Sequence, residues 1–166
     1  MRTIYLDYNA TTPLDEAVRD AMLPFLGENF GNPSSVHHVG QRARVALDDA
    51  RERICAVLRC SPSEIIFTSG ATESCNQAIF GAAELGRENG RHIVTSAIEH
   101  PSVLHACEYL ASNAGFELSV VSPNPSGLVA AEAVFEAVRP DTILVSLMSA
   151  NNEVGTLQPV AEVGEF

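Results

Sequence analysis

The stretch HIVTSAIEHPSVLHACEYLA, residues 92–111, indicates the fold class. Its first five residues are mostly apolar or β-branched and predict a strand over 92–96. Pro101 then begins a helical pattern that continues to residue 111. The same change recurs on both sides: we expect strands over 64–68, 116–121 and 142–147, and helices over 72–88 and 130–138. Strands that alternate with helices predict an α/β fold with a mainly parallel sheet flanked by helices.

The flanking segments are predominantly helical. Helices are expected over 15–26 and 36–58, after a short extended segment over 3–7. A further amphipathic pattern begins at residue 158 and continues to residue 166. A chain of 166 residues is long enough for one domain or for part of a larger one.

The composition argues against several classes of function. The 21 acidic residues outnumber the ten basic ones and give a formal net charge of −11, which argues against a nucleic-acid or anionic-membrane surface. All ten basic residues are arginines, so this chain cannot supply a lysine Schiff base or a P-loop lysine. No apolar run approaches about 18 residues, and we expect a soluble, cytoplasmic protein with neither a metal site nor a disulfide framework.

Three polar turns follow predicted strands. Residues 69–74 form a small-residue turn at the start of a helix, where backbone N–H groups attract anions. The second turn, residues 97–101, contains His100. The third, residues 149–156, contains two asparagines and a glutamate. Each alone is explained more simply as an ordinary turn or a polar loop histidine. Together they would converge on one sheet edge and favour a site for an anionic ligand.

Five motifs resemble those of one family. Their order and spacing are similar to those of cysteine desulfurases of the NifS/IscS type, within the class V aminotransferase group. The resemblance covers essentially the whole chain and is carried by YLDYNATTP (5–13), FGNPSS (30–35), TSGATES (68–74), EHPSV (99–103) and ANNEVGT (150–156).

The resemblance implies a fold-type I enzyme that depends on pyridoxal 5′-phosphate (PLP) and works as a homodimer. Such enzymes take sulfur from L-cysteine, leave L-alanine, and pass the sulfur to an acceptor or scaffold protein for iron–sulfur clusters and other thio-cofactors. By the same resemblance, Ala71 and Thr72 bind the cofactor phosphate. His100 stacks on the pyridine ring and assists proton transfer, and Asn152 hydrogen-bonds near the phenolic oxygen. Residues Asn9, Ala10 and Thr11 lie near the substrate entrance.

Family members are more than twice this length, so we expect an N-terminal portion. Residues 1–14 would form an arm and residues 15–166 an incomplete large, PLP-binding domain, with the small domain absent. The Schiff-base lysine and the persulfide cysteine would lie beyond Phe166. The four cysteines match no persulfide position: Cys55 and Cys107 fit buried thiols, and Cys75 fits a helix residue better than a sulfur carrier.

Two alternatives stay open at the level of sequence. A truncated paralogue could act as a non-catalytic binding or dimerisation module. Another class V member, such as a selenocysteine lyase, could share the fold and act on a different substrate, since substrate choice depends largely on residues outside this chain.

We predict that the 166-residue chain alone shows no desulfurase turnover, because it has no lysine to activate the cofactor as a Schiff base. The measurement is sulfide release from L-cysteine by the pure chain supplied with PLP. Turnover that depends on PLP and on the chain would contradict this prediction.

Overall fold

A helix of 21 residues dominates the first of two units into which the chain divides, residues 4–67 and 68–166. The computed structural model describes residues 4–166, so residues 1–3 of the expected arm lie outside the described residues. Helix α2 (His38–Leu58) begins where His37 Nδ1 accepts the Gly40 N–H at 3.3 Å. It ends at Arg59, whose left-handed backbone (φ 56°) directs its N–H to the Cys55 carbonyl. No helix between residues 4 and 166 combines the length and apolarity needed to cross a membrane.

The helix expected over 15–26 is divided in two. Asp15 caps α1 (Glu16–Met22) by accepting two backbone N–H groups, and the 3-10 helix η1 (Leu23–Leu26) follows. Pro24 accounts for the change, since it has no N–H to continue the α-helical ladder. The expected helix therefore lies where it was predicted, but its last four residues are 3-10 helix and not α-helix.

The strand expected over 64–68 is not formed, and this expectation is corrected. Residues Pro62–Glu64 form the 3-10 helix η2, and the Ser61 N–H donates to the Glu64 carboxylate at 2.6 Å. Ile65 is extended, but residues 64–68 pair with no strand in the part of the chain that the structure describes. Arg51 holds the segment instead: its guanidinium donates to the Ile65 carbonyl and stacks over the Phe67 ring, 4.8 Å from its centroid. Extended backbone becomes a strand only where a neighbour accepts and donates its hydrogen bonds.

The second unit is built around a parallel sheet with the strand order β2-β1-β3. Its strands are β1 (His92–Ser96), β2 (Glu117–Val121) and β3 (Thr142–Ser146). All five residues of β1 are buried, because this strand has a hydrogen-bonded neighbour on each side and helices on both faces.

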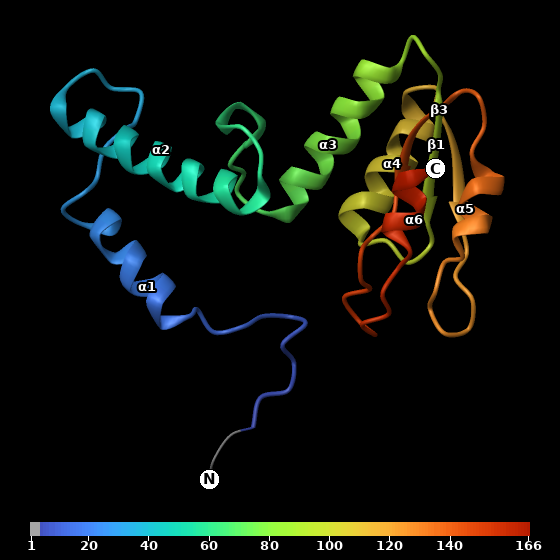
Figure 1. Ribbon diagram of the computed structural model, residues 1–166, viewed down its shortest axis with the longest axis horizontal. Helices are drawn as coiled ribbons and strands as arrows, with labels where there is room; N and C mark the ends of the chain where they lie inside the picture. The colour runs from blue at the N-terminus through green and yellow to red at the C-terminus, as the bar shows by residue number, and fades with distance from the viewer. Residues whose placement is uncertain (1–3) are drawn as a thin grey trace. The chain divides into compact units, whose positions relative to one another are not determined.

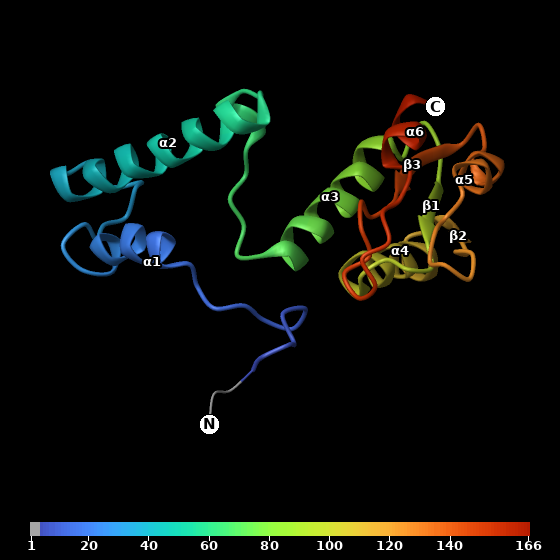
Figure 2. The ribbon, with the colours of Figure 1, turned by 60° about the horizontal axis from the view of Figure 1, so that its bottom comes forward.

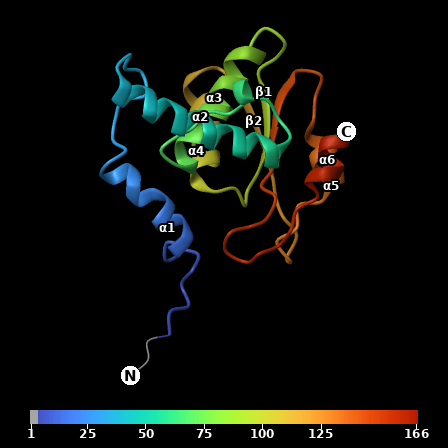
Figure 3. The ribbon, with the colours of Figure 1, turned by 60° about the vertical axis from the view of Figure 1, so that its left-hand side comes forward.

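Helices cover both faces of the sheet. Figure 2 shows α3 (Ala71–Gly86) and α4 (Pro101–Asn113) on one side of β1 and α5 (Ala131–Ala137) on the other. Helix α6 (Val160–Glu165) lies beside α5, where Phe166 stacks on Phe135 with centroids 4.3 Å apart (Figures 1 and 3). Successive residues of β1 point to opposite layers: Ile93 packs with α3 and α4, and Val94 packs with α5. The expected α/β class, a mainly parallel sheet flanked by helices, is confirmed.

A buried histidine connects the three strands. His92 of β1 is fully buried; its Nδ1 lies 2.7 Å from Thr142 Oγ1 on β3, and its Nε2 lies 2.9 Å from Ser119 Oγ on β2. Thr142 Oγ1 also accepts the Arg139 N–H at 2.7 Å. Burial, followed by the positive charge of Arg139, lowers the pKa of His92 below its ordinary value of 6.5.

We predict that Gly90→Ala destabilises the protein by at least about 2 kcal/mol, because a Cβ at Gly90 would overlap the backbone carbonyl of Asp141 and force the start of β1 away from that of β3. The matched control is Gly81→Ala in the interior of α3, where a Cβ meets open space and the change stabilises the helix by about 0.5–1 kcal/mol. Urea unfolding measures both variants. Equal stability of the two would contradict the prediction.

We also predict that the free energy of unfolding falls as the pH is lowered from about 6.5. The unfolded chain then takes up a proton on His92, whereas the folded chain accepts it only at lower pH, because its pKa is lowered. Urea midpoints between pH 5 and 8 measure this slope. His92→Asn should flatten it relative to the wild type, whereas Gly81→Ala should keep it. A slope that survives unchanged in His92→Asn would assign the acid sensitivity to other groups.

Candidate functional site

The turn before α3 is held by its own hydroxyl and carboxylate groups. Thr68 Oγ1 and Ser74 Oγ lie 2.6 Å apart, and Glu73 Oε2 accepts both the Ser69 N–H at 2.7 Å and the Ser69 hydroxyl at 2.6 Å. These bonds close the turn around Gly70, which is the N-cap of α3 and has an extended backbone. The shape of the turn is therefore set by bonds among its own residues.

The amino end of α3 is suited to an anion. The two hydrogen bonds from Ser69, that of the hydroxyl first, lower the pKa of Glu73, so its charge is used within the turn. Among residues 4–166, no side chain caps the first-turn N–H groups of α3, which include those of Ala71 and Thr72. Free N–H groups and the positive end of the helix dipole favour a phosphate or carboxylate here, and the Thr72 hydroxyl adds a further donor.

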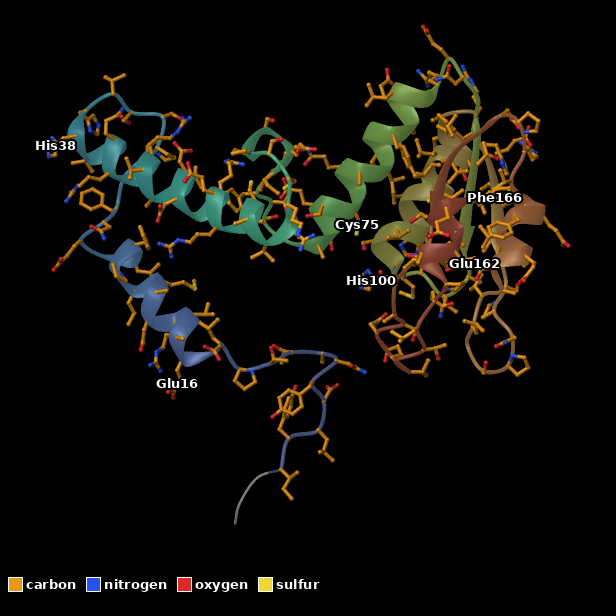
Figure 4. The ribbon with its side chains drawn as sticks, in the orientation of Figure 1. Glu16, His38, Cys75, His100, Glu162 and Phe166 are labelled. Atoms are coloured by element: carbon orange, nitrogen blue, oxygen red, sulfur yellow. The ribbon has the colours of Figure 1, made fainter. Side chains whose placement is uncertain are left out.

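His100 is held by the helix that follows it. It is the N-cap of α4, and its Nδ1 accepts the Ser102 N–H at 3.1 Å and lies 2.8 Å from Ser102 Oγ. Because Nδ1 carries the accepting lone pair, the proton of the neutral ring sits on Nε2. The ring is exposed and thus presents Nε2 and its flat face to a ligand (Figure 4).

Thr72 and His100 line the same hollow, which has a volume of about 490 Å³. It lies between α3, which contributes Thr72, Asn76 and Phe80, and the first turns of α4. Asn76 Nδ2 connects the two helices by donating to the Thr72 carbonyl at 2.8 Å and to the Ser102 carbonyl at 3.4 Å. Concave sites of this size hold small molecules and cofactors.

Asn152 lies in the loop after β3 and is exposed. Its Nδ2 donates to Glu153 Oε1 at 2.9 Å, and it is not among the residues that line the hollow. Its neighbour Asn151 is half-buried and fixes the turn, since its Oδ1 accepts the N–H groups of Glu153 and Val154 at 3.0 Å each. Among residues 4–166, Asn152 is therefore the asparagine of the pair whose side chain makes no bond outside the turn itself.

The predicted convergence of three turns is found only in part, and by a different route from the one expected. The turns after β1 and β3 do meet, because these strands are parallel neighbours. The turn at residues 69–74 follows no sheet strand, and the packing of α3 on α4 is what places Thr72 and His100 at one hollow. Asn9, Ala10 and Thr11 belong to the other unit, where the N–H groups of Ala10 and Thr11 donate to the Asp7 carbonyl. Their place near a substrate stays a prediction.

Two residues of this region had no role assigned from the sequence. Asn76 stands one helical turn after Thr72, and Glu99 directly precedes His100. Glu99 is only 8% exposed, and its Oε1 accepts the Met148 N–H at 2.6 Å and the Ser96 hydroxyl at 3.1 Å. Burial raises the pKa of Glu99, although both hydrogen bonds oppose that rise. The signal in the sequence was an acidic residue three positions after the end of a buried strand, which becomes informative only when its burial is known.

Three of the four cysteines, Cys55, Cys75 and Cys107, pack in or against the interior. Cys55 and Cys107 are buried, as expected, and burial raises the pKa of Cys107 to about 11, so this thiol stays protonated at neutral pH. Cys75 is half-buried on α3 and packs against the core (Figure 4). No group of three or more His, Cys, Asp or Glu side chains in residues 4–166 is arranged to hold a metal ion.

Comparison with known proteins gives one consistent result. The family model described as Aminotransferase class-V matches residues 4–166. The putative cysteine desulfurase IscS 1 of Bacillus subtilis (strain 168) is 49% identical over 166 residues, which are 100% of this chain and 44% of that protein. Cysteine desulfurase IscS of Dictyoglomus turgidum is 48% identical, over 99% of this chain and 42% of its own length.

Solved structures agree with the sequence relatives. A NifS-like protein superposes with a TM-score of 0.92 at 44% identity, over 98% of this chain and 44% of that one. SspA in complex with cysteine gives a TM-score of 0.91 at 44% identity, over 98% of this chain and 47% of that one. The chain therefore spans less than half the length of the relatives it matches. The resemblance carried by the five motifs is confirmed.

Proposed function

This chain belongs to the class V aminotransferase family, and from that premise we propose that it is part of a PLP-dependent cysteine desulfurase, which takes sulfur from L-cysteine and leaves L-alanine. Relatives that bear the name cysteine desulfurase support this activity over others of the family. A solved relative described in complex with cysteine supports L-cysteine as the substrate.

One observation of the structure carries the proposal. The hollow between α3 and α4 combines the amino end of a helix, uncapped by any side chain, with an exposed imidazole ring on the facing helix. The uncapped helix end can bind a phosphate, and a flat heteroaromatic ring can stack on the imidazole. PLP contains both groups in one molecule, so the residues present fit this cofactor.

Thr72 and His100 would hold the two parts of the cofactor. The phosphate would accept hydrogen bonds from the N–H groups of Ala71 and Thr72 and from the Thr72 hydroxyl. The ring would stack on His100. When bound, PLP supplies the electron sink that the chemistry on the amino acid requires.

His100 is also suited to proton transfer. Its Nδ1 accepts the Ser102 N–H, so Nε2 is the nitrogen that can give a proton to a substrate and regain it from solvent. The exposed Asn152 amide would orient the phenolic oxygen and the substrate, and Asn9, Ala10 and Thr11 would border the substrate entrance.

The remaining parts of the enzyme would come from outside these residues. The sequence contains no lysine, so the amine that binds the cofactor covalently would be supplied by residues outside the 166. Residues 1–14 would serve as an arm and 15–166 as part of the cofactor-binding domain of a cytoplasmic homodimer. The sulfur would pass to an acceptor or scaffold protein for iron–sulfur cluster synthesis, and the net charge of −11 is compatible with a basic one.

We predict that the protein binds PLP and that Thr72→Val weakens this binding about tenfold, through the loss of one hydroxyl donor to a charged phosphate. His100→Asn should weaken it about two- to tenfold, because it removes the ring but keeps a side chain able to cap α4. Equilibrium dialysis with absorbance detection of PLP gives both dissociation constants.

Ser112→Ala, an exposed hydroxyl in the last turns of α4, and His38→Asn on α2 are the matched controls and should bind PLP as the wild type does. Affinities of Thr72→Val and His100→Asn equal to those of their controls would remove the hollow as the cofactor site.

A further inference from the structure

We propose that Glu99 and Asn151 are positioning residues, which together clamp the loop that carries His100 to the loop that carries Asn152. We call these two side chains and their cross-loop hydrogen bonds the Glu99–Asn151 clamp. The inference rests on the proposed function, since it assigns the clamp to the placement of two residues of the proposed cofactor site.

The first half of the clamp reaches from the loop after β1 to the loop after β3. Glu99 Oε1 accepts the backbone N–H of Met148 at 2.6 Å, a short distance typical of a charge-assisted bond. The same oxygen accepts the Ser96 hydroxyl at 3.1 Å, and Glu99 as a residue is only 8% exposed. A buried carboxylate is costly unless its bonds are made, so this arrangement tolerates little displacement of either loop.

The second half reaches in the opposite direction. Asn151 Nδ2 donates to the Ile98 carbonyl at 3.3 Å, while its Oδ1 accepts two N–H groups of its own turn. Asn151 therefore bonds both within its own turn and to the neighbouring loop. Glu99 does the same, through Ser96 in its own loop and Met148 in the other. Both bonds between the loops end on backbone atoms, and therefore fix the main chain and not merely a side-chain rotamer.

The position of each clamp residue indicates its purpose. Glu99 directly precedes His100, and Asn151 directly precedes Asn152. In each pair the first residue turns inward to bind the opposite loop, and the second is exposed. Strand pairing ends at Ser96 and Ser146, so the sheet itself does not fix these loops beyond their first residues. Beyond the ends of the strands, the clamp takes over the connection between the two loops, as far as the positions of His100 and Asn152.

The clamp is tested with variants that remove one cross-loop bond each. Asn151→Asp keeps the oxygen that accepts the turn N–H groups but loses the N–H donor to Ile98. Glu99→Ala loses the acceptor for Met148, and Glu99→Gln restores a neutral acceptor of the same shape. Glu162→Gln makes the same chemical change on the exposed surface of α6 and serves as control (Figure 4).

Two readouts are taken on the whole protein: the dissociation constant for PLP, and the His100 ring resonances with amide exchange at Met148 by NMR. We expect Asn151→Asp and Glu99→Ala to weaken PLP binding at least about fivefold and to shift the His100 resonances. In Glu99→Ala the Met148 amide should exchange faster. Glu99→Gln should stay within about twofold of the wild type, and Glu162→Gln should be unchanged.

Wild-type PLP affinity and wild-type His100 resonances in Asn151→Asp and Glu99→Ala would overturn the proposal. If Glu99→Ala does not fold, Asn151→Asp and Glu99→Gln decide by the same criteria. If the wild type itself does not bind PLP, the proposed function fails, and the His100 resonances alone judge the clamp: unshifted resonances in Asn151→Asp would still reject it.

Discussion

The complete burial of β1 is the constraint on which the second unit depends. A strand buried on both faces must satisfy its backbone on both edges, so β2 and β3 pair with it in parallel. Parallel neighbours direct their carboxyl ends to one edge of the sheet, and the loops after β1 and β3 are thereby brought together. The helices follow from the same constraint, because each parallel connection must cross a face of the sheet, and α4 and α5 cover the two faces where Ile93 and Val94 point.

Gln158 is buried beside Gly127 and Val129, and two further buried polar groups of this unit lie near the two ends of β1. At its start, His92 bonds to a hydroxyl on each neighbouring strand, and at its end Glu99 bonds to the loop after β3. No buried side-chain N or O atom in the described residues is without a partner. Such groups stabilise little in net terms, but they are costly when unpaired and so penalise a slip of one strand along another. Apolar packing supplies the stabilisation, and these groups define the register.

The sequence predicted the α/β class because periodicity is a local property: alternation of strand and helix between residues 92 and 147 needs no knowledge of contacts. It also singled out Thr72 and His100, through motifs that resemble those of one family; the structure brings both residues to one hollow, and their roles toward a cofactor stay predictions. It failed where the outcome depends on distant residues. The segment 64–68 has the composition of a strand but pairs with no strand among the described residues, and Pro24 divides a helix whose apolar spacing continues through it. Glu99 and Asn76 were missed because burial and tertiary hydrogen bonds, not residue type, distinguish them from ordinary surface residues.

The site combines two kinds of structural support. Helix packing places Thr72 opposite His100, with Asn76 bonded to the carbonyls of residues on both helices, so the hollow keeps its width as long as α3 and α4 stay packed. Strand pairing places His100 beside the loop of Asn152. His100 belongs to both systems, because its ring is tied to α4 through Ser102 and its backbone adjoins the sheet through Glu99. In the proposed site, where His100 would stack on a ring and move a proton, both restraints would act on this one residue. The cofactor side and the substrate side of the proposed site can therefore be held in one geometry by a single residue.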